Sequence, residues 1–217
     1  MTVEQHIWGA TPEGEAIVIY TMRNALGSEV QLSNIGAGIV AVRFADREGK
    51  VEDVVLGYRS PMSYFGDGAC AGKTVGRVAN RINKGEFELD GVKYNIPQNS
   101  NGHSLHGGNK GIDMVVWDVE YVADNAITLV LHSKDGDDGF PGNLDITMTY
   151  TLTPENEFEV TYHAKTDKKT VVNLSHHSFF NLKGEGNGTI EDHILTIKAD
   201  KITPTDAGLI PTGELLA

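Results

Sequence analysis

The residues on either side of one Asp-Gly pair constrain the fold most strongly. The segment GEFELDGVKYNIP, residues 85–97, alternates apolar and polar residues on both sides of Asp90-Gly91. Asp-Gly suits a type I′ turn, in which both central residues need positive φ, so this segment predicts a β-hairpin. The same period of two runs through residues 117–133 and 144–166, with turn residues at Asp124-Asn125 and Pro154–Asn156. These segments predict two more hairpins.

Shorter alternating runs predict further strands at residues 16–24, 29–36, 53–58 and 193–199. Nowhere do apolar residues recur with helical spacing over three turns between capping residues. The 25 glycines are typical of a chain built from turns and short strands. We therefore expect an all-β fold, a large antiparallel β-sandwich forming one domain over residues 1–217, with long loops around 60–80, 97–115 and 132–142.

Charge and composition exclude several classes of function. Eighteen basic and 30 acidic residues give a net charge of −12, which would repel nucleic acid. The single cysteine, Cys70, excludes a disulfide framework and any multi-cysteine metal site. The N-terminus lacks a basic start followed by an apolar stretch, and no segment approaches the roughly 20 apolar residues that span a bilayer. We expect a cytoplasmic, soluble protein with no membrane partner.

Two adjacent histidines occur in NLSHHSFFNL, residues 173–182. Neighbouring strand residues point to opposite faces of a sheet. His177 then shares a polar face with Asn173, Ser175, Phe179 and Asn181, whereas His176 lies on the mainly apolar face. We predict His177 as the ligand-facing histidine and His176 as a core histidine with a satisfied hydrogen bond.

The glycine-rich loop NSNGHSLHGGNKG supplies a second pair, His103 and His106. An H-x-x-H spacing can supply two metal ligands, but the loop offers no cysteine and no obvious third ligand, so we expect no metal site. We favour instead a loop histidine that lies beside a ligand-binding cleft. In GRVANRI, residues 76–82, two arginines four residues apart flank an asparagine. Guanidinium groups there suit recognition of hydroxyls or carboxylates, and a surface salt bridge is the alternative.

Five motifs then occur in the order found in the aldose 1-epimerases (galactose mutarotases): GRVANRINKGEFELDGVKYNI, SLHGGNKGIDMVVW, DGFPGNL, NLSHHSFFNLKG and DHILTIKADKITPTDAGLIPTGE. The resemblance covers essentially the whole chain. It implies a β-supersandwich whose open cleft binds a free aldohexose such as galactose or glucose and interconverts its α and β anomers, with no cofactor. By this resemblance His177 is the acid, His106 is a second catalytic histidine at the cleft, and Asn80 and Arg81 bind sugar hydroxyls.

The chain departs from the family pattern at three places. His103 and His176 stand where family members often have asparagine, and we expect these changes to tune the site. Family members also run on about half as long again after the IPTGE turn, and that segment carries an acidic sugar ligand and the glutamate base. The resemblance therefore implies a sandwich incomplete at its C-terminal end that lacks the base, because Glu214 belongs to the turn. Two alternatives remain open: a non-catalytic sugar-binding module, and an epimerase of hexose 6-phosphates.

Overall fold

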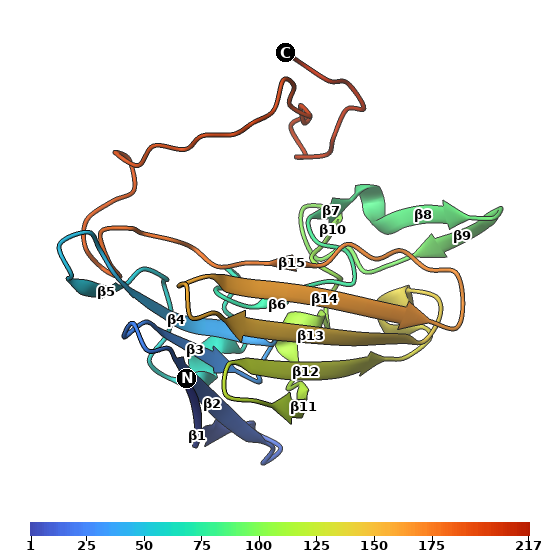
Figure 1. Cartoon of the computed structure of the whole chain (residues 1–217). Coiled ribbons are helices and arrows are strands. Elements are labelled where there is room, and N and C mark those ends of the chain that lie inside the picture. Colours follow the sequence, from blue (N-terminus) through green and yellow to red (C-terminus); the bar gives the residue numbers. More distant parts are fainter.

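The computed structural model describes residues 1–217, and residues 2–53 form an antiparallel sheet (Figure 1). The strands follow chain order across this first sheet. They are β1 (Thr2–Ala10), β2 (Ala16–Arg23), β3 (Glu29–Ser33), β4 (Gly38–Ala45) and β5 (Val51–Asp53). A bulge leaves Val40 without a partner on β3, so that Ile39 and Val42 both turn into the core.

A second antiparallel sheet packs against the first. Its four strands are also in chain order: β11 (Asp118–Val122), β12 (Ala126–Ser133), β13 (Leu144–Leu152) and β14 (Phe158–Thr166). Along β13 the even-numbered residues from Leu144 to Leu152 are buried and the odd-numbered ones are not. This alternation is the one that the sequence predicts, and it directs one face of the sheet to the core.

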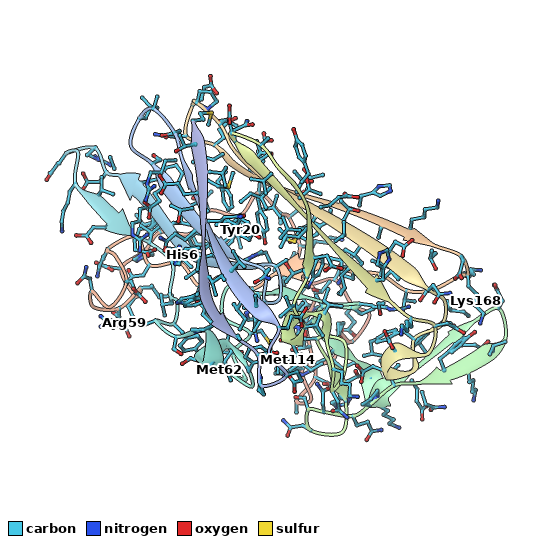
Figure 2. The ribbon with its side chains drawn as sticks, turned by 90° about the horizontal axis from the view of Figure 1, so that it is seen from below. His6, Tyr20, Arg59, Met62, Met114 and Lys168 are labelled. Atoms are coloured by element: carbon cyan, nitrogen blue, oxygen red, sulfur yellow. The ribbon has the colours of Figure 1, made fainter.

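One continuous core joins the two sheets. Tyr20, Val30 and Leu32 from the first sheet pack in the same cluster as Leu129 and Met148 from the second. Figure 2 shows Tyr20 between the sheets, with His6 and Arg59 on the outer side of the first sheet. The all-β, antiparallel prediction is therefore confirmed, and the structure contains no helix long and apolar enough to cross a membrane.

Short elements lie in and beside the segments that the sequence predicts as loops, and one falls in the predicted strand of residues 173–182. Besides four 3₁₀ helices, they comprise β6 (Thr74–Val75), β7 (Arg81–Ile82), β10 (Ser104–Leu105) and β15 (Ser175–His176). The 3₁₀ helices are η1 (Pro61–Tyr64), η2 (Asn83–Gly85), η3 (Ile112–Met114) and η4 (Asp137–Gly139). The predicted hairpin is present as β8 (Glu86–Leu89) and β9 (Val92–Asn95), and both turn residues, Asp90 and Gly91, have positive φ.

Two strand predictions are wrong. Residues 193–199 form no strand, because no neighbouring strand lies against them and their backbone makes no ladder hydrogen bonds. Ile194 is accordingly 94% exposed, and the chain from about residue 186 runs away from the sandwich (Figure 1). Residues 53–58 form no strand of their own, since β5 ends at Asp53 and only Val55 makes an isolated bridge, to Phe180. The sequence reasoning also missed β1 and β4.

Candidate functional site

Two short ladders bring three distant segments of the chain together. In one, β15 pairs with β6, and His176 lies opposite Thr74. In the other, β10 pairs with β7, and Leu105 lies opposite Arg81. Because residues 74–82 take part in both ladders, they connect the loop that carries His106 to the segment directly after β15 that carries His177.

His106 and Asn80 hold each other through two reciprocal hydrogen bonds. The His106 backbone N–H donates to the Asn80 carbonyl at 3.1 Å, and the Asn80 backbone N–H donates to His106 Nδ1 at 3.0 Å. Both residues have positive φ, 52° for His106 and 63° for Asn80. Because Nδ1 accepts a hydrogen bond from an amide, the neutral ring carries its proton on Nε2. His106 can therefore offer an Nε2–H donor.

The His177 ring lies directly beside His106. Their ring centroids are 5.0 Å apart at an interplanar angle of 81°, and the Phe179 ring lies 5.1 Å from His177 on the other side. Burial, and next the nearby charge of His177, lower the pKa of His106, so His106 is neutral at pH 7. The His177 ring nitrogens have no hydrogen-bond partner in the protein, which leaves them free for a ligand.

Arg81 completes the group of predicted residues. Its guanidinium donates to the Asn80 side-chain oxygen at 3.4 Å and forms no ion pair. Most of its N–H donors are therefore available. His177, His106, Asn80 and Arg81 thus lie together, and the sequence had singled out all four.

His176 lies behind this group, as the face alternation predicts. Its Nδ1 pairs with the Ser178 hydroxyl at 3.0 Å, and its ring meets the buried Tyr150 ring edge-on at 6.2 Å. Its Nε2 is buried without any partner, so the expected satisfied hydrogen bond exists at only one of the two nitrogens. Burial lowers the pKa of His176 to about 4, with a smaller effect from His177, so this ring stays neutral at pH 7.

The predicted alternation does not continue beyond residue 178. Asn181 is buried, although the sequence places it on the ligand-facing side, whereas Phe180 and Leu182 are exposed. The physical reason is that β15 ends at His176, and Asn181 instead donates its backbone N–H to Val54. A strict period of two holds only while the chain is in a strand.

Arg77 does not take part in the site, contrary to the interpretation of two arginines as a recognition pair. Its guanidinium is buried and donates to the Ser133 hydroxyl and to four backbone carbonyls of the segment 133–142. It therefore holds that loop in place. The surface salt-bridge alternative is equally wrong, since Arg77 makes no ion pair and lies inside the protein.

The two loop histidines serve different backbone positions. His103 Nδ1 accepts a hydrogen bond from the Lys84 backbone N–H at 3.1 Å, whereas His106 binds Asn80. Each ring thus has its Nδ1 occupied by an amide. No group of three or more potential metal ligands gathers in the structure.

A buried ion cluster under the site was missed at the sequence level. The Lys73 ammonium is fully buried and lies 2.7 Å from an Asp67 oxygen and 3.3 Å from an Asp113 oxygen. It also donates to the Tyr64 carbonyl at 2.7 Å. Cys70 lies nearby, and burial raises the pKa of its thiol to about 12, so it stays protonated. A lysine inside the glycine-rich run ACAGKTVGR was the available signal.

Comparison with known proteins assigns the family. The family model described as Aldose 1-epimerase matches residues 18–217. The chain belongs to the aldose 1-epimerase family. It is 41% identical to the galactose mutarotase of Sus scrofa over 215 residues, which are 99% of this chain and 62% of that protein. It is 38% identical to the aldose 1-epimerase of Escherichia coli K12 over 200 residues, covering 92% of this chain and 58% of that protein.

Solved structures of this family agree with the fold. An aldose epimerase homologue from C. elegans superimposes with a TM-score of 0.87 at 33% identity, covering 92% of this chain and 61% of that one. A galactose 1-epimerase from Lactobacillus acidophilus gives 0.86 at 28% identity, covering 99% and 62%. The chain therefore spans about three-fifths of the length of the aldose 1-epimerases that it matches.

Proposed function

We propose that this chain carries the proton-transfer site of an aldose 1-epimerase that acts on free aldohexoses such as galactose and glucose. The observation that supports this most is the His106–His177 pair, 5.0 Å apart and flanked by Asn80 and Arg81, in a chain of this family. Proton transfer at neutral pH calls for groups of this kind.

In the proposed reaction, a base removes the proton of the anomeric hydroxyl while an acid protonates the ring oxygen. The bond between C1 and the ring oxygen breaks, the resulting aldehyde rotates about C1–C2, and the ring closes with the roles exchanged. His177 delivers the proton to the ring oxygen, and the His106 Nε2–H donates a hydrogen bond to the same region. Asn80 and Arg81 bind sugar hydroxyls.

The catalytic base of this reaction is not assigned to any residue of this chain. The family resemblance assigns it to a glutamate that follows the IPTGE turn, and no carboxylate of this chain forms a hydrogen bond or ion pair with His106, His177 or Arg81. Loss of one acid/base partner lowers the rate by about 10²- to 10⁴-fold. We expect the 217-residue chain to turn over slowly.

Polarimetry of freshly dissolved α-D-galactose tests the assignment. We expect the chain to accelerate mutarotation weakly, His177→Gln to return it to the rate of buffer, and His163→Gln to leave it unchanged. His163 is an exposed residue of β14 that makes no hydrogen bond or ring contact with the four site residues, which makes it a matched control. Galactose binding followed by ligand-observed NMR should be lost in Arg81→Ala.

A non-catalytic sugar-binding role is the second candidate, because no carboxylate contacts the two histidines. Binding of galactose that depends on Arg81, without any acceleration of mutarotation, would favour it. Absence of both turnover and Arg81-dependent binding would overturn both candidates. A preference for glucose 6-phosphate over glucose would instead indicate the hexose 6-phosphate branch, although Arg77 is buried and only Arg81 offers a free guanidinium in the site. The cytoplasmic location and the lack of a nucleic-acid partner stay predictions.

A further inference from the structure

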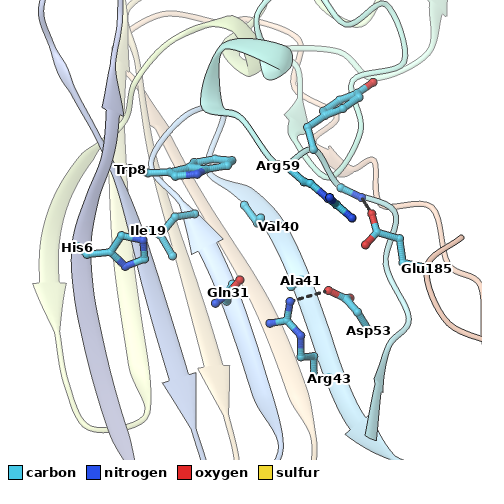
Figure 3. Close-up of a pocket in the computed structure, with 12 residues that line it drawn as sticks. His6, Trp8, Ile19, Gln31, Val40, Ala41, Arg43, Asp53, Arg59 and Glu185 are labelled. Carbon is cyan, nitrogen blue, oxygen red and sulfur yellow. Dashed lines mark hydrogen bonds and ion pairs between the residues drawn. The ribbon is translucent and has the colours of Figure 1, made fainter.

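A pocket separate from the histidine site lies on the outer face of the first sheet (Figure 3). Its volume is about 330 Å³, and it shares no residue with the group formed by His106, His177, Asn80 and Arg81. Gln31 and Arg43 line its floor, because along β3 and β4 they alternate with the core residues Val30 and Val42. The pocket therefore lies on the face of the first sheet that points away from the sandwich core.

Aromatic side chains form one rigid wall. The Trp8 ring meets Tyr64 edge-on at 5.6 Å, and the Tyr58 ring meets it at 5.0 Å. Tyr64 itself is buried, and its hydroxyl accepts a hydrogen bond from the Tyr58 backbone N–H at 3.0 Å. Packing thus fixes the two lining rings before any ligand arrives, which lowers the entropy lost on binding. The Trp8 indole N–H has no partner in the protein and can donate to a ligand.

The remaining lining combines the apolar Ile19, Val40 and Ala41 with polar residues whose charges cancel. Arg43 is paired with Asp53 at 3.1 Å, and Glu185 accepts a hydrogen bond from the Gly57 backbone N–H at 3.3 Å (Figure 3). Arg59 extends into the pocket without an ion pair. Two arginines thus face two carboxylates, with no excess of either sign.

We propose that this pocket is a second carbohydrate-binding site, which takes a neutral mono- or oligosaccharide and is independent of the histidine site. The apolar C–H face of a pyranose fits the Trp8 ring, and its hydroxyls need the mixture of donors and acceptors that Arg59, Gln31 and Glu185 supply. An anion would gain little, because the attraction of Arg59 is offset by Glu185 and because Arg43 is already paired with Asp53. A purely apolar ligand would desolvate charged groups without replacing their hydrogen bonds.

The proposal concerns binding alone, so it does not depend on the proposed epimerase activity. Ligand-observed saturation-transfer NMR with galactose, lactose, maltose and cellobiose tests it on the 217-residue chain. Three variants separate the two sites: Trp8→Ala and Arg59→Ala in the pocket, and Arg81→Ala at the histidine site. Tryptophan fluorescence gives a second readout, because Trp8 is partly exposed whereas the other tryptophan, Trp117, is 1% exposed.

We expect at least one of these sugars to bind saturably in Arg81→Ala and to quench Trp8 fluorescence. Trp8→Ala should weaken that binding by at least about tenfold, since aromatic anchors dominate binding energy. Arg59→Ala, which removes an exposed and unpaired side chain, should weaken it without lowering the melting temperature, and it replaces Trp8→Ala if that variant unfolds. Sugar binding that survives both pocket variants would overturn the proposal. So would the absence of saturable binding in Arg81→Ala, or tighter binding of glucuronate than of any neutral sugar.

Discussion

The buried histidine behind the site gives a prediction whose size follows from the structure. The pKa of His176 falls from its ordinary 6.5 to about 4 on folding, chiefly because the ring is buried. Between these two values the unfolded chain binds a proton at this residue and the folded chain does not. The free energy of unfolding therefore falls by about 1.4 kcal/mol for each pH unit of acidification in this window. Over the whole window His176 should account for a loss of about 3 kcal/mol, and stability is fully restored above pH 6.5.

His176→Asn isolates this contribution. The asparagine amide can keep the contact that Nδ1 makes with the Ser178 hydroxyl, and it removes both the titrating group and the unpartnered Nε2. Urea denaturation of both proteins between pH 7 and pH 4 gives the free energy of unfolding at each pH. The difference between wild type and His176→Asn should move by about 3 kcal/mol in favour of the variant as pH falls.

The difference between the two proteins is the informative quantity, because other titrating groups affect both alike. His163→Asn, a change at an exposed histidine, should run parallel to the wild type. If the curves of wild type and His176→Asn were also parallel, the ring would be charged or solvated in the folded state. The reasoning from its burial would then be refuted.

Three further perturbations address other parts of the molecule. Lys73→Met leaves two buried carboxylates without their cation and should lower the free energy of unfolding by about 3–5 kcal/mol; an unchanged melting temperature would show that the ion cluster is hydrated. His106→Asn retains an acceptor for the Asn80 N–H but loses the Nε2–H, so it should fold with near-normal stability and lose sugar binding or turnover. His106→Gln places its amide at the position of Nε2 and a methylene at the position of Nδ1, so it keeps a donor toward the sugar but should lose about 1 kcal/mol of stability, and equal stability of the two variants would contradict the tautomer assignment. Limited trypsin digestion followed by mass spectrometry should cut first within residues 186–201, where exposed backbone makes few hydrogen bonds, and early cleavage inside the two sheets would count against the packing described.

Local sequence rules succeeded where neighbouring residues decide the structure. Asp90-Gly91 forms the turn with positive φ at both positions, as the pair predicts, because the turn geometry depends on those two residues alone. The alternation along 144–152 likewise gives the buried face of β13 correctly. His176 is inside for the same reason.

The local rules failed where the structure of a segment depends on residues distant in sequence. Residues 193–199 alternate like a strand, but a strand requires a second strand beside it, and alternation does not reveal whether one is present. Lys73 is buried because Asp113, from the loop of residues 97–115, joins Asp67 of its own loop around the ammonium. The hydrogen bond that fixes the His106 tautomer depends on positive φ at Asn80, a conformation for which the sequence gives only the residue type as a hint.

Burial determines the charge of two histidines in and behind the candidate site. His176 and His106 are both neutral at pH 7, the first through burial and the second through burial next to His177, so neither places a second full positive charge beside the proposed acid. Arg81 is then the fixed cation of the group, and it lies next to Asn80. A sugar whose ring oxygen contacts His177 would meet a neutral Nε2–H donor from His106 and a guanidinium from Arg81. In the proposed reaction, this arrangement would stabilise negative charge that develops on sugar oxygens during ring opening, while His177 retains both ring nitrogens for proton exchange.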